Sequence, residues 1–571
     1  MLIPMQGRAG FEITTSGRAV FGSSYRLEAA DPVMLNTANA AAAGLVGLTT
    51  NGANSDDGNT NFRRGDATST ALKAYLDVNA KNGDLTALLR VKAWYDYALK
   101  NQPRAFGNIG NNYVAGEPLS DRGAAPLARF SGVAAGDAWV QQRFAQGLVR
   151  IGQQSLNWGE RVSFIGGLQG LNPTDFPALH RPGAVPQEIK VPVPMLFGRL
   201  EPVKGVAVEG FWQTHFRPEV LDQCGTFYEI NDWAQPGCDK VFAGLPAGSD
   251  RTRVGTGGYL KRIDDPLPHQ RQQYGMAVLW TADSLATDFG LYGARYTSRK
   301  SNGVLQKSTR TVGAPLIPGD PDGKNVRYFS EFPDGIEIYG ATFAHKRGAT
   351  TWYGEATYRL HQPIAYGPGD ALGAFVSATA ASLLRARANA MAPGAYFEAM
   401  DRFRVSQAQV GVQHDWQGAG GIAYSGMAEA VVKHVFNLPQ QGTLRYGRAD
   451  QYGLGAIGAL CVSTTPTPDK QCSQDGYVSS HSWAYRLRLD ARFGEVAPGT
   501  TAALSTTFTN DVKGWSGDFF INEGRQTLNV ALRFEFQKRY SAEIAFTPVW
   551  GGDYNPQHDR DQLAMAVGVK F

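Results

Sequence analysis

The chain ends in Leu563-Ala-Met-Ala-Val-Gly-Val-Lys-Phe571, and this stretch decides the fold class. Its apolar residues stand at every second position, from Leu563 to Phe571, and alternate with small residues and one lysine. A period of two is that of a β-strand with one apolar face. The end of the chain is therefore predicted to be an amphipathic strand.

The same alternation recurs far upstream. Between Leu85 and Tyr97 one face is apolar, whereas Arg90 and Lys92 lie on the other. The preceding 72–79 segment alternates as well, and Asn82-Gly83 supplies a two-residue hairpin turn between them. Near the end, 528–537 and 542–546 form another pair, joined by a short link at Lys538-Arg539. These are strand-turn-strand units.

Strands of this kind are predicted along the whole chain. They cover 16–27, 72–79, 85–97, 138–151, 203–211, 275–280, 288–296, 336–345, 351–360, 405–416, 421–432, 485–493, 501–508, 528–537, 542–546 and 563–571. We expect about 16 antiparallel strands, within roughly 14 to 18, because single-chain bacterial barrels use even numbers.

Composition and hydropathy permit a membrane barrel. The chain has 67 Gly, a formal charge of +4 and a mean hydropathy of -0.28, with no apolar run long enough for a spanning helix. Barrel strands do not give a high mean hydropathy, because half of the residues of each strand face the lumen. An array of soluble β-sandwiches is the alternative. Aromatic clusters near strand ends, such as Trp94-Tyr95 and Trp352-Tyr353, favour a barrel with interfacial girdles.

We therefore predict an all-β protein, a single transmembrane antiparallel β-barrel over residues 1–571 in the bacterial outer membrane. The closing aromatic residue, Phe571, resembles the signal read by the barrel assembly machinery. The start at Met1 lacks a secretory signal, so we expect a processed form or a start assigned too late. Balanced charge gives no support to a nucleic-acid partner, and the expected surroundings are outer-membrane lipid.

Three segments, near 36–68, 218–273 and 363–400, are too long for turns and are predicted to be extracellular loops. The third contains the Ala- and Leu-rich run 371–384, which has good helix propensity and is too short to span a bilayer. We expect either a short lumenal helix or a helix on the surface of the loop. The acidic word Asp56-Asp-Gly-Asn-Thr-Asn61 could hold calcium, but it lacks a full calcium-loop pattern, so we predict a solvated loop and no metal.

The four cysteines form two local pairs, Cys224 with Cys238 and Cys461 with Cys472. Both pairs lie in turn-like surroundings, and no CxxC spacing or histidine cluster accompanies them. Short disulfides in an oxidising compartment are predicted.

Polar residues on predicted inward faces are candidates for a lumen or substrate path. Arg150 and Gln154 share one face of a strand, and the word Trp158-Gly-Glu-Arg161 follows it. The candidates are Arg150, Gln154, Asn157, Glu160, Arg161, Arg486, Arg488 and Arg492. The alternative for the first five is an ordinary strand end with Trp158 in an aromatic girdle.

Catalysis finds little support in the residues. A barrel esterase or lipase needs a His and a Ser on one strand face, whereas the adjacent His481 and Ser482 point to opposite faces. No GxSxG elbow and no nucleotide or cofactor site is found in the sequence. We expect no enzyme activity and no cofactor.

Several words resemble the bacterial family DUF1302, a domain of unknown function, over the full length of the chain. They are Asn61-Phe-Arg-Arg-Gly-Asp66, Ala93-Trp-Tyr-Asp96, the Gly152-Gln-Gln segment that leads to Trp158-Gly-Glu160, and Pro192-Val-Pro194. The resemblance implies an outer-membrane barrel that works with a periplasmic lipoprotein-like partner and an inner-membrane transporter of the RND superfamily. It also implies a hydrophobic cargo.

We predict passive passage of a hydrophobic or amphipathic compound, such as a lipid, fatty acid or sterol, through the outer membrane. The alternatives are a general diffusion porin for small polar solutes and, third, a barrel-embedded esterase or lipase. The charged faces at Arg486, Arg488 and Arg492 lean toward polar contents or a plugged interior.

Overall fold

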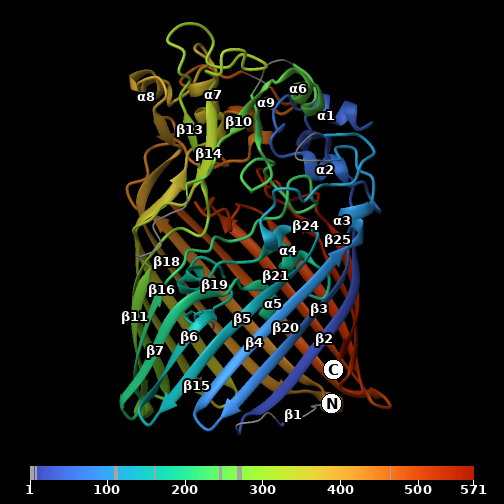
Figure 1. Cartoon of the computed structure of the whole chain (residues 1–571), viewed down its shortest axis with the longest axis vertical. Helices are drawn as coiled ribbons and strands as arrows, with labels where there is room; N and C mark the ends of the chain where they lie inside the picture. Colours follow the sequence, from blue (N-terminus) through green and yellow to red (C-terminus); the bar gives the residue numbers. More distant parts are fainter. Residues whose placement is uncertain are drawn as a thin grey trace.

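The chain forms a closed antiparallel β-barrel with a cap of loops at one end (Figure 1). The computed structural model describes residues 5–6, 10–107, 113–159, 162–243, 247–266, 273–462 and 464–571. The C-terminal end of the chain and the short strand β1 (Met5–Gln6) lie at the end opposite the cap (Figure 1). Among the described residues, no helix is long and apolar enough to cross a membrane.

The main sheet contains 20 strands, and without the short β1 (Met5–Gln6) and β24 (Val549–Trp550) the described chain has eighteen wall strands. The wall strands are β2 (Glu12–Arg26), β3 (Ala67–Asn82), β4 (Leu85–Asp96), β5 (Ser131–Phe144), β6 (Gly147–Gln154), β7 (Val193–Val203), β8 (Val206–Gln213), β11 (Tyr274–Ala282), β12 (Thr287–Tyr296), β15 (Ile336–Arg347), β16 (Thr350–Ala365), β18 (Met400–Gln417), β19 (Ala423–Val435), β20 (His481–Ala497), β21 (Thr500–Lys513), β22 (Gln526–Phe536), β23 (Tyr540–Thr547) and β25 (Gln562–Lys570). Each pairs with the next, and β25 pairs with β2, which closes the ring.

The predicted all-β antiparallel barrel is confirmed, with eighteen described wall strands in place of about 16. The predicted strand 138–151 is wrong, because it contains the end of β5, a tight turn and most of β6. The other strand absent from the prediction is β7, which has Pro194 and Pro202 near its ends. Proline lowers the strand signal, although it is tolerated at strand ends.

Side chains alternate between the two faces of the wall as the sequence predicts. Outward positions carry large exposed apolar residues: Leu72, Val140, Ile151, Met276, Leu291, Val410, Leu487 and Val567. On β4, Leu89 and Tyr95 are exposed, whereas Lys92 and Trp94 are buried inside the barrel. Trp94 is thus no girdle residue, because its indole N–H donates to the carbonyl of Arg129 in a loop above β5.

Short turns join the strands at the lower rim, and long connections join them at the upper rim (Figure 1). A two-residue hairpin turn joins β3 and β4 as predicted, but its residues are Gly83 and Asp84, because Asn82 still pairs with Leu85. Gly83 has a φ of +57°, which favours glycine in such a turn. The upper connections 27–66, 214–273 and 366–399 form much of the cap. The predicted disulfides Cys224–Cys238 and Cys461–Cys472 are both present in the cap.

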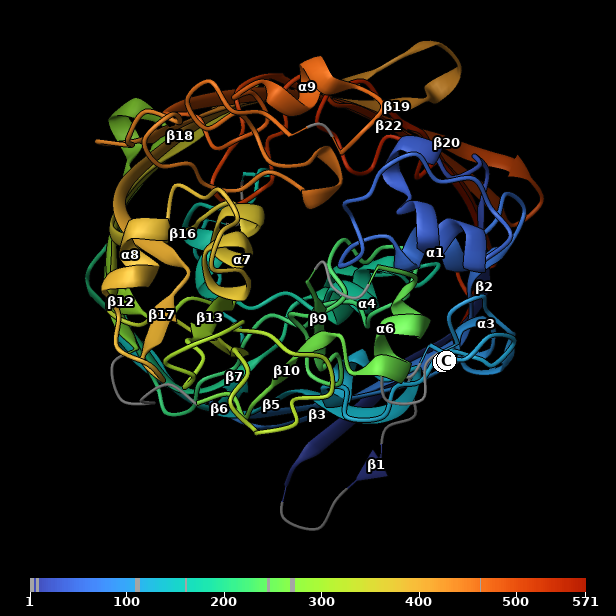
Figure 2. The same cartoon turned by 90° about the horizontal axis from the view of Figure 1, so that it is seen from above.

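The cap contains a second, five-stranded sheet and several short helices (Figure 2). Its strands are β9 (Lys240–Phe242), β10 (Tyr259–Arg262), β13 (Asn302–Gln306), β14 (Arg327–Glu331) and β17 (Tyr396–Glu398). The helices above the wall are α1 (Thr37–Ala42), α2 (Asp57–Asn61), α3 (Tyr97–Asn101), α6 (Asp250–Thr256), α7 (Pro368–Val376), α8 (Arg385–Ala390) and α9 (Pro468–Cys472).

The predicted helix 371–384 is wrong as one element, and it does not lie in the lumen. The helix α7 ends at Val376, because the Ser377 hydroxyl accepts hydrogen bonds from the backbone N–H groups of Thr379 and Ala380. Phe375 packs in a core of the cap together with Phe397 of β17 and Leu384, which precedes α8. The run therefore belongs to the hydrophobic core of the cap.

Candidate functional site: the barrel interior

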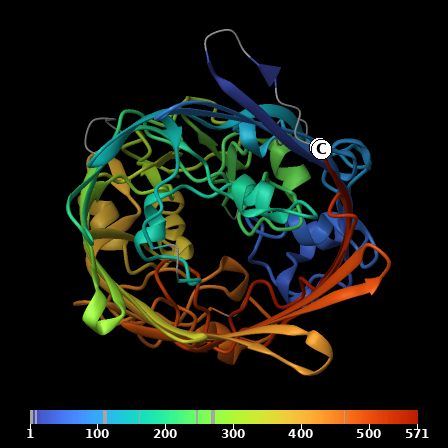
Figure 3. The same ribbon diagram turned by 90° about the horizontal axis from the view of Figure 1, so that it is seen from below.

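The connection between β6 and β7, residues 155–192, folds into the barrel, and we call it the inner loop. It contains a 3-10 turn at Leu168–Leu171, α4 (Phe176–His180) and α5 (Pro186–Ile189). Figures 1 and 3 show α4 and α5 within the ring of wall strands. The inner loop therefore obstructs part of the interior.

One side of the inner wall, formed by the five wall strands from β7 to β15, is largely apolar and covered by the inner loop, and we call it the dry half. Trp158 is 3% exposed and packs against Phe211 of β8 and Tyr292 of β12, with ring centroids 5.1 and 5.2 Å away. Its indole N–H donates to Glu209 at 2.8 Å. The remaining members of this cluster are Leu156, Leu168, Leu171, Val193, Met195, Ala277, Tyr296, Ile336 and Ile338. This half of the wall is dry.

On β16 and β19, two buried carboxylates hold the tip of the inner loop. Glu429 accepts hydrogen bonds from the backbone N–H groups of Ser163 at 2.9 Å and Phe164 at 3.1 Å. Glu355 accepts from the N–H of Leu168 at 2.8 Å. Charged acceptors make the stronger hydrogen bonds to backbone N–H groups. The tip is therefore attached through charged acceptors, and Phe164 also packs against Val431, Ala484 and Ile521.

Basic side chains attach the same segment from the wall. Arg486 of β20 donates to the carbonyl of Ser163 at 3.0 Å, and its guanidinium lies 4.6 Å from the centre of the Phe164 ring. Lys433 of β19 donates to the carbonyl of Ile165 at 3.2 Å. Together with Glu355 and Glu429, these groups fix the tip by charge.

The other end of the inner loop is attached on the opposite side of the barrel. Lys92 of β4 pairs with Asp175 at 2.6 Å, and Lys73 of β3 pairs with Glu188 at 2.7 Å. Counted from β2, β4 is the third and β19 the thirteenth of the eighteen wall strands, so they face each other across the ring. Figure 2 shows β3 and β19 on opposite sides. The inner loop therefore crosses the interior.

The contact between the tip and the wall leaves several polar atoms unpaired. In the part of the chain that the structure describes, Gln407 has no hydrogen-bond partner for either amide atom, although it is 2% exposed. Glu355 Oε2 and Arg359 Nε also lack one among these residues. Buried polar groups without partners cost free energy that is recovered when water reaches them. This attachment is weaker than the number of its hydrogen bonds suggests.

Below the tip, the wall from β18 to β21 is polar and open. Arg488 is paired with Asp490 at 2.8 Å, and the Asp490 carboxylate also accepts from Ser505 at 2.6 Å. Arg492 lines a groove of about 470 Å³ together with Asp415 and Ser425. This half of the wall is wet.

The predicted path residues are not brought together at one place. Arg150 donates to Gln141 at 2.6 Å, and Gln154 donates to the carbonyl of Met195 at 3.1 Å, both within the β5–β7 wall. Arg486, Arg488 and Arg492 lie on β20, nine wall strands from β6 and so across the ring. Of these, Arg486 contacts the inner loop, whereas Arg488 and Arg492 lie below it.

The remaining predicted positions are distributed over the chain. Asn157 is exposed within the inner loop, whereas Glu160 and Arg161 lie outside the described residues. Phe571 exchanges two backbone hydrogen bonds with Gly17 of β2, and its role as an assembly signal stays a prediction. His481 is exposed and Ser482 buried, on opposite faces of β20. Trp158 lies in the interior and not in a girdle, because the chain turns inward after β6.

Sequence reasoning missed the groups that hold the inner loop: Lys73, Lys92, Asp175, Glu188, Glu355, Arg359, Glu429 and Lys433. Alternation assigns the wall members of this set to the inward face. A signal was available in β19, where Glu429 stands between Ala428 and Ala430 as the only acidic residue of the strand. Such an isolated acid on an inward face calls for a donor from elsewhere in the chain.

Comparisons with solved structures give matches over nearly the whole chain. OccAB1 of Acinetobacter baumannii is 12% identical, with a TM-score of 0.41, and the match covers 98% of this chain and 96% of that one. OccK2 (OpdF) of Pseudomonas aeruginosa, solved in complex with glucuronate, is 8% identical, with a TM-score of 0.39 and 98% coverage of each chain. OpdK of the same species, solved with vanillate, has the same values.

No curated protein matches the chain. A family model matches residues 4–571, which is almost the entire chain, and the resemblance inferred from the sequence is thereby confirmed. The chain belongs to the family described as protein of unknown function (DUF1302).

Proposed function

We propose that the protein is a gated channel of the bacterial outer membrane, through which a small polar or amphipathic solute passes passively. The outward faces of the wall strands carry exposed apolar side chains, which suit hydrocarbon and not water. Loops and turns join the strands at both rims. Because the ring is closed, no strand edge leaves unpaired backbone N–H and C=O groups in the bilayer. The barrel is built to span a membrane.

The observation that carries the proposal is the attachment of the inner loop across the interior. Its base packs on the dry half of the wall through Trp158, and its tip is held on the other side by Glu355 and Glu429. The tip contact contains unpaired polar atoms, such as the Gln407 amide, within the described chain. The hydrogen-bonding groups of the tip regain water when they leave the wall, whereas the packing of Phe164 opposes this movement. We expect the tip to leave the wall more readily than the base, as a gate does.

The chemistry of the two halves bears on the cargo. Along the wet half, a solute meets charged groups such as Arg488 and Asp490, and these favour a polar or charged part. An apolar part of the solute would contact the dry half only where the inner loop does not cover it. An amphipathic compound fits both halves, whereas a purely hydrophobic lipid or sterol fits one. The periplasmic lipoprotein-like partner and the RND-superfamily transporter stay proposals that rest on the family resemblance.

The test uses the full-length protein reconstituted in liposomes, with influx of a small sugar and a small carboxylate as the readout. The substitution Arg488→Trp places an indole in the wet half. It should reduce influx several-fold, because it narrows the path. The matched control is Leu487→Trp, the next residue of β20, whose side chain is 47% exposed on the outward face. This control should leave influx unchanged.

Two results would overturn the channel. Influx of every polar solute could equal that of protein-free liposomes while a fatty acid or sterol is transferred, which would indicate a lipid carrier. Alternatively, Arg488→Trp and Leu487→Trp could behave alike, and the wet half would then not be the path. A large, steady influx with no gating in single-channel records would indicate a general diffusion porin.

A further inference from the structure

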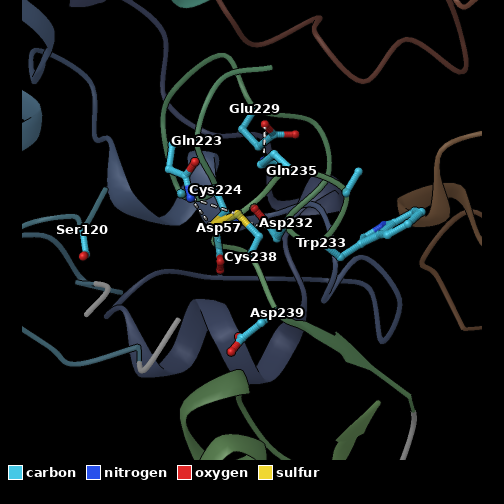
Figure 4. Close-up of a disulfide and its surroundings, with 12 residues drawn as sticks. Asp57, Ser120, Gln223, Cys224, Glu229, Asp232, Trp233, Gln235, Cys238 and Asp239 are labelled. Carbon is cyan, nitrogen blue, oxygen red and sulfur yellow. Dashed lines mark hydrogen bonds between the residues drawn. A yellow bond between two sulfur atoms is a disulfide. The ribbon is translucent and has the colours of Figure 1, made fainter. Parts of the chain in front are cut away.

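The cap contains a group of buried carboxylates outside the barrel. Asp56 and Asp57 stand at the start of α2, Asp250 begins α6, and Asp232 lies in the segment closed by the Cys224–Cys238 disulfide. Each is at most 2% exposed. One carboxylate oxygen from each of Asp56, Asp57 and Asp250 lies within 4.8 Å of the others. Figure 4 shows Asp57 and Asp232 beside the disulfide. The predicted solvated loop is thus wrong, because this word is buried.

Few positive charges balance this group. Arg253 pairs with Asp250 at 3.3 Å. In the described part of the chain, Asp56, Asp57 and Asp232 form no ion pair, and Asp56 is held by neutral donors such as the Asn39 amide at 2.9 Å. Buried carboxylates that lack a cation either take up protons or bind a metal ion.

Two buried oxygens point to a ligand at this place. Asp57 Oδ1 and the Tyr113 hydroxyl face each other, and neither forms a well-aligned hydrogen bond among the described residues. Tyr113 is 1% exposed, and its hydroxyl lies beside the Asp57 carboxylate. Unpaired buried polar atoms that meet at one point are expected where an ion completes their coordination.

We propose that Asp56, Asp57 and Asp250, with Asp232 beside them, bind one calcium ion in the cap. The donors are all oxygens, and carboxylates dominate, which selects a hard cation over zinc or copper. Calcium accepts irregular coordination and gives up its water readily, whereas magnesium keeps several waters and needs near-octahedral geometry. A dry site built from two connections of the cap suits calcium.

The ion would tie separate parts of the cap together. Asp56 and Asp57 belong to the connection 27–66, whereas Asp232 and Asp250 belong to 214–273. The neighbouring Ser55 carbonyl accepts from the Gln451 amide at 3.1 Å, which brings in a third connection, 436–480. Binding is therefore expected to order the cap above the barrel entrance.

The test is calorimetric titration of calcium chloride into chelator-treated, full-length protein in detergent at pH 7.5. We expect saturable binding of one calcium ion per chain, at least about tenfold tighter than magnesium. Asp57→Asn should weaken binding about tenfold or more. The control is Asp553→Asn, a carboxylate that is 74% exposed and lies outside the group, and it should bind as the wild type does.

Stability against pH gives a second readout that needs no variant. Burial, opposed in part by Arg253, raises the pKa of Asp250 to about 8, and burial raises the pKa of Asp232 to about 7. Carboxyl groups with raised pKa values stabilise the fold below their unfolded pKa of about 4 and lose that stabilisation as the pH rises through 7 and 8. Without calcium, the unfolding temperature should fall from pH 5 to pH 8.

Calcium should reverse that fall at pH 8 and have little effect at pH 5, where protons compete for the same oxygens. The wild-type result decides the proposal even if Asp57→Asn does not fold. Absence of saturable calcium binding at pH 7.5 would overturn it, and so would an unfolding temperature at pH 8 that calcium leaves unchanged. Equal calcium affinity of Asp57→Asn and the wild type would show that the ion binds elsewhere.

Discussion

The two halves of the inner wall differ in how they hold the same loop. From β7 to β15, the inner loop packs with apolar side chains around Trp158, and that contact excludes water. From β16 to β20, it is held by charged groups such as Glu429 and Arg486, next to unpaired polar atoms. Apolar burial gains from the absence of water, whereas charged contacts compete with it. We therefore expect the base of the loop at Trp158 to stay in place and the tip at 163–168 to exchange its contacts for water more readily.

This contrast also bears on the proposed gate. The base of the inner loop keeps its position, because removing Trp158 from Phe211 would expose a large aromatic surface. The tip exchanges hydrogen bonds for water at a smaller cost. In the proposed channel, opening is therefore expected to need movement of the tip alone and to uncover the wet half near Arg488.

The largest expected effect comes from releasing the fixed end. Trp158→Ala should remove about 3–5 kcal/mol of packing, which is enough to shift the docked loop toward release by more than about a hundredfold. We expect high, constant conductance and rapid proteolysis of the inner loop. Trp212→Ala is the matched control, since Trp212 is 47% exposed on the outward face of β8. Low conductance in both variants would show that the apolar half does not fix the loop.

A smaller effect is expected from the charged half. Arg486→Gln removes the charged donor to the Ser163 carbonyl and should cost about 1.5 kcal/mol, so the channel should open about tenfold more often. Arg488→Gln makes the same change of charge two residues further along β20, on the same face, where Arg488 pairs with Asp490 and not with the loop. This control should change ion selectivity and leave opening unaltered. The reverse pattern in single-channel records would break the comparison.

Much of the fold could be predicted from alternation alone. Apolar and polar faces are assigned correctly on β4 and β20, where Leu89 and Leu487 face outward and Lys92 and Arg486 inward. The strand number was too low for two local reasons. The turn between β5 and β6 has no Asn-Gly or Asp-Gly signal, and the prolines of β7 obscure a strand between two turns.

The site was harder to predict, because alternation gives a face and not a partner. Arg486 was selected for its charge, yet its partner Ser163 lies more than 300 residues away in the chain. Glu429 was overlooked although it holds the same residue. The acidic word at Asp56 was recognised, but its burial depends on Asp250 from a distant connection. Contacts of this kind follow from the closed ring and the cap and not from local pattern.

In the proposed channel, the tip of the inner loop closes the path through its contacts with Glu355 and Glu429. The most direct measurement is single-channel conductance in planar bilayers of the double variant Glu355→Ala/Glu429→Ala. Its control is Asp415→Ala/Asp490→Ala, which removes two carboxylates from the wet half, where they bond to wall residues and not to the loop. A several-fold higher mean conductance in the first variant only is predicted. Conductance equal to that of the wild type would contradict a loop held shut by these two residues.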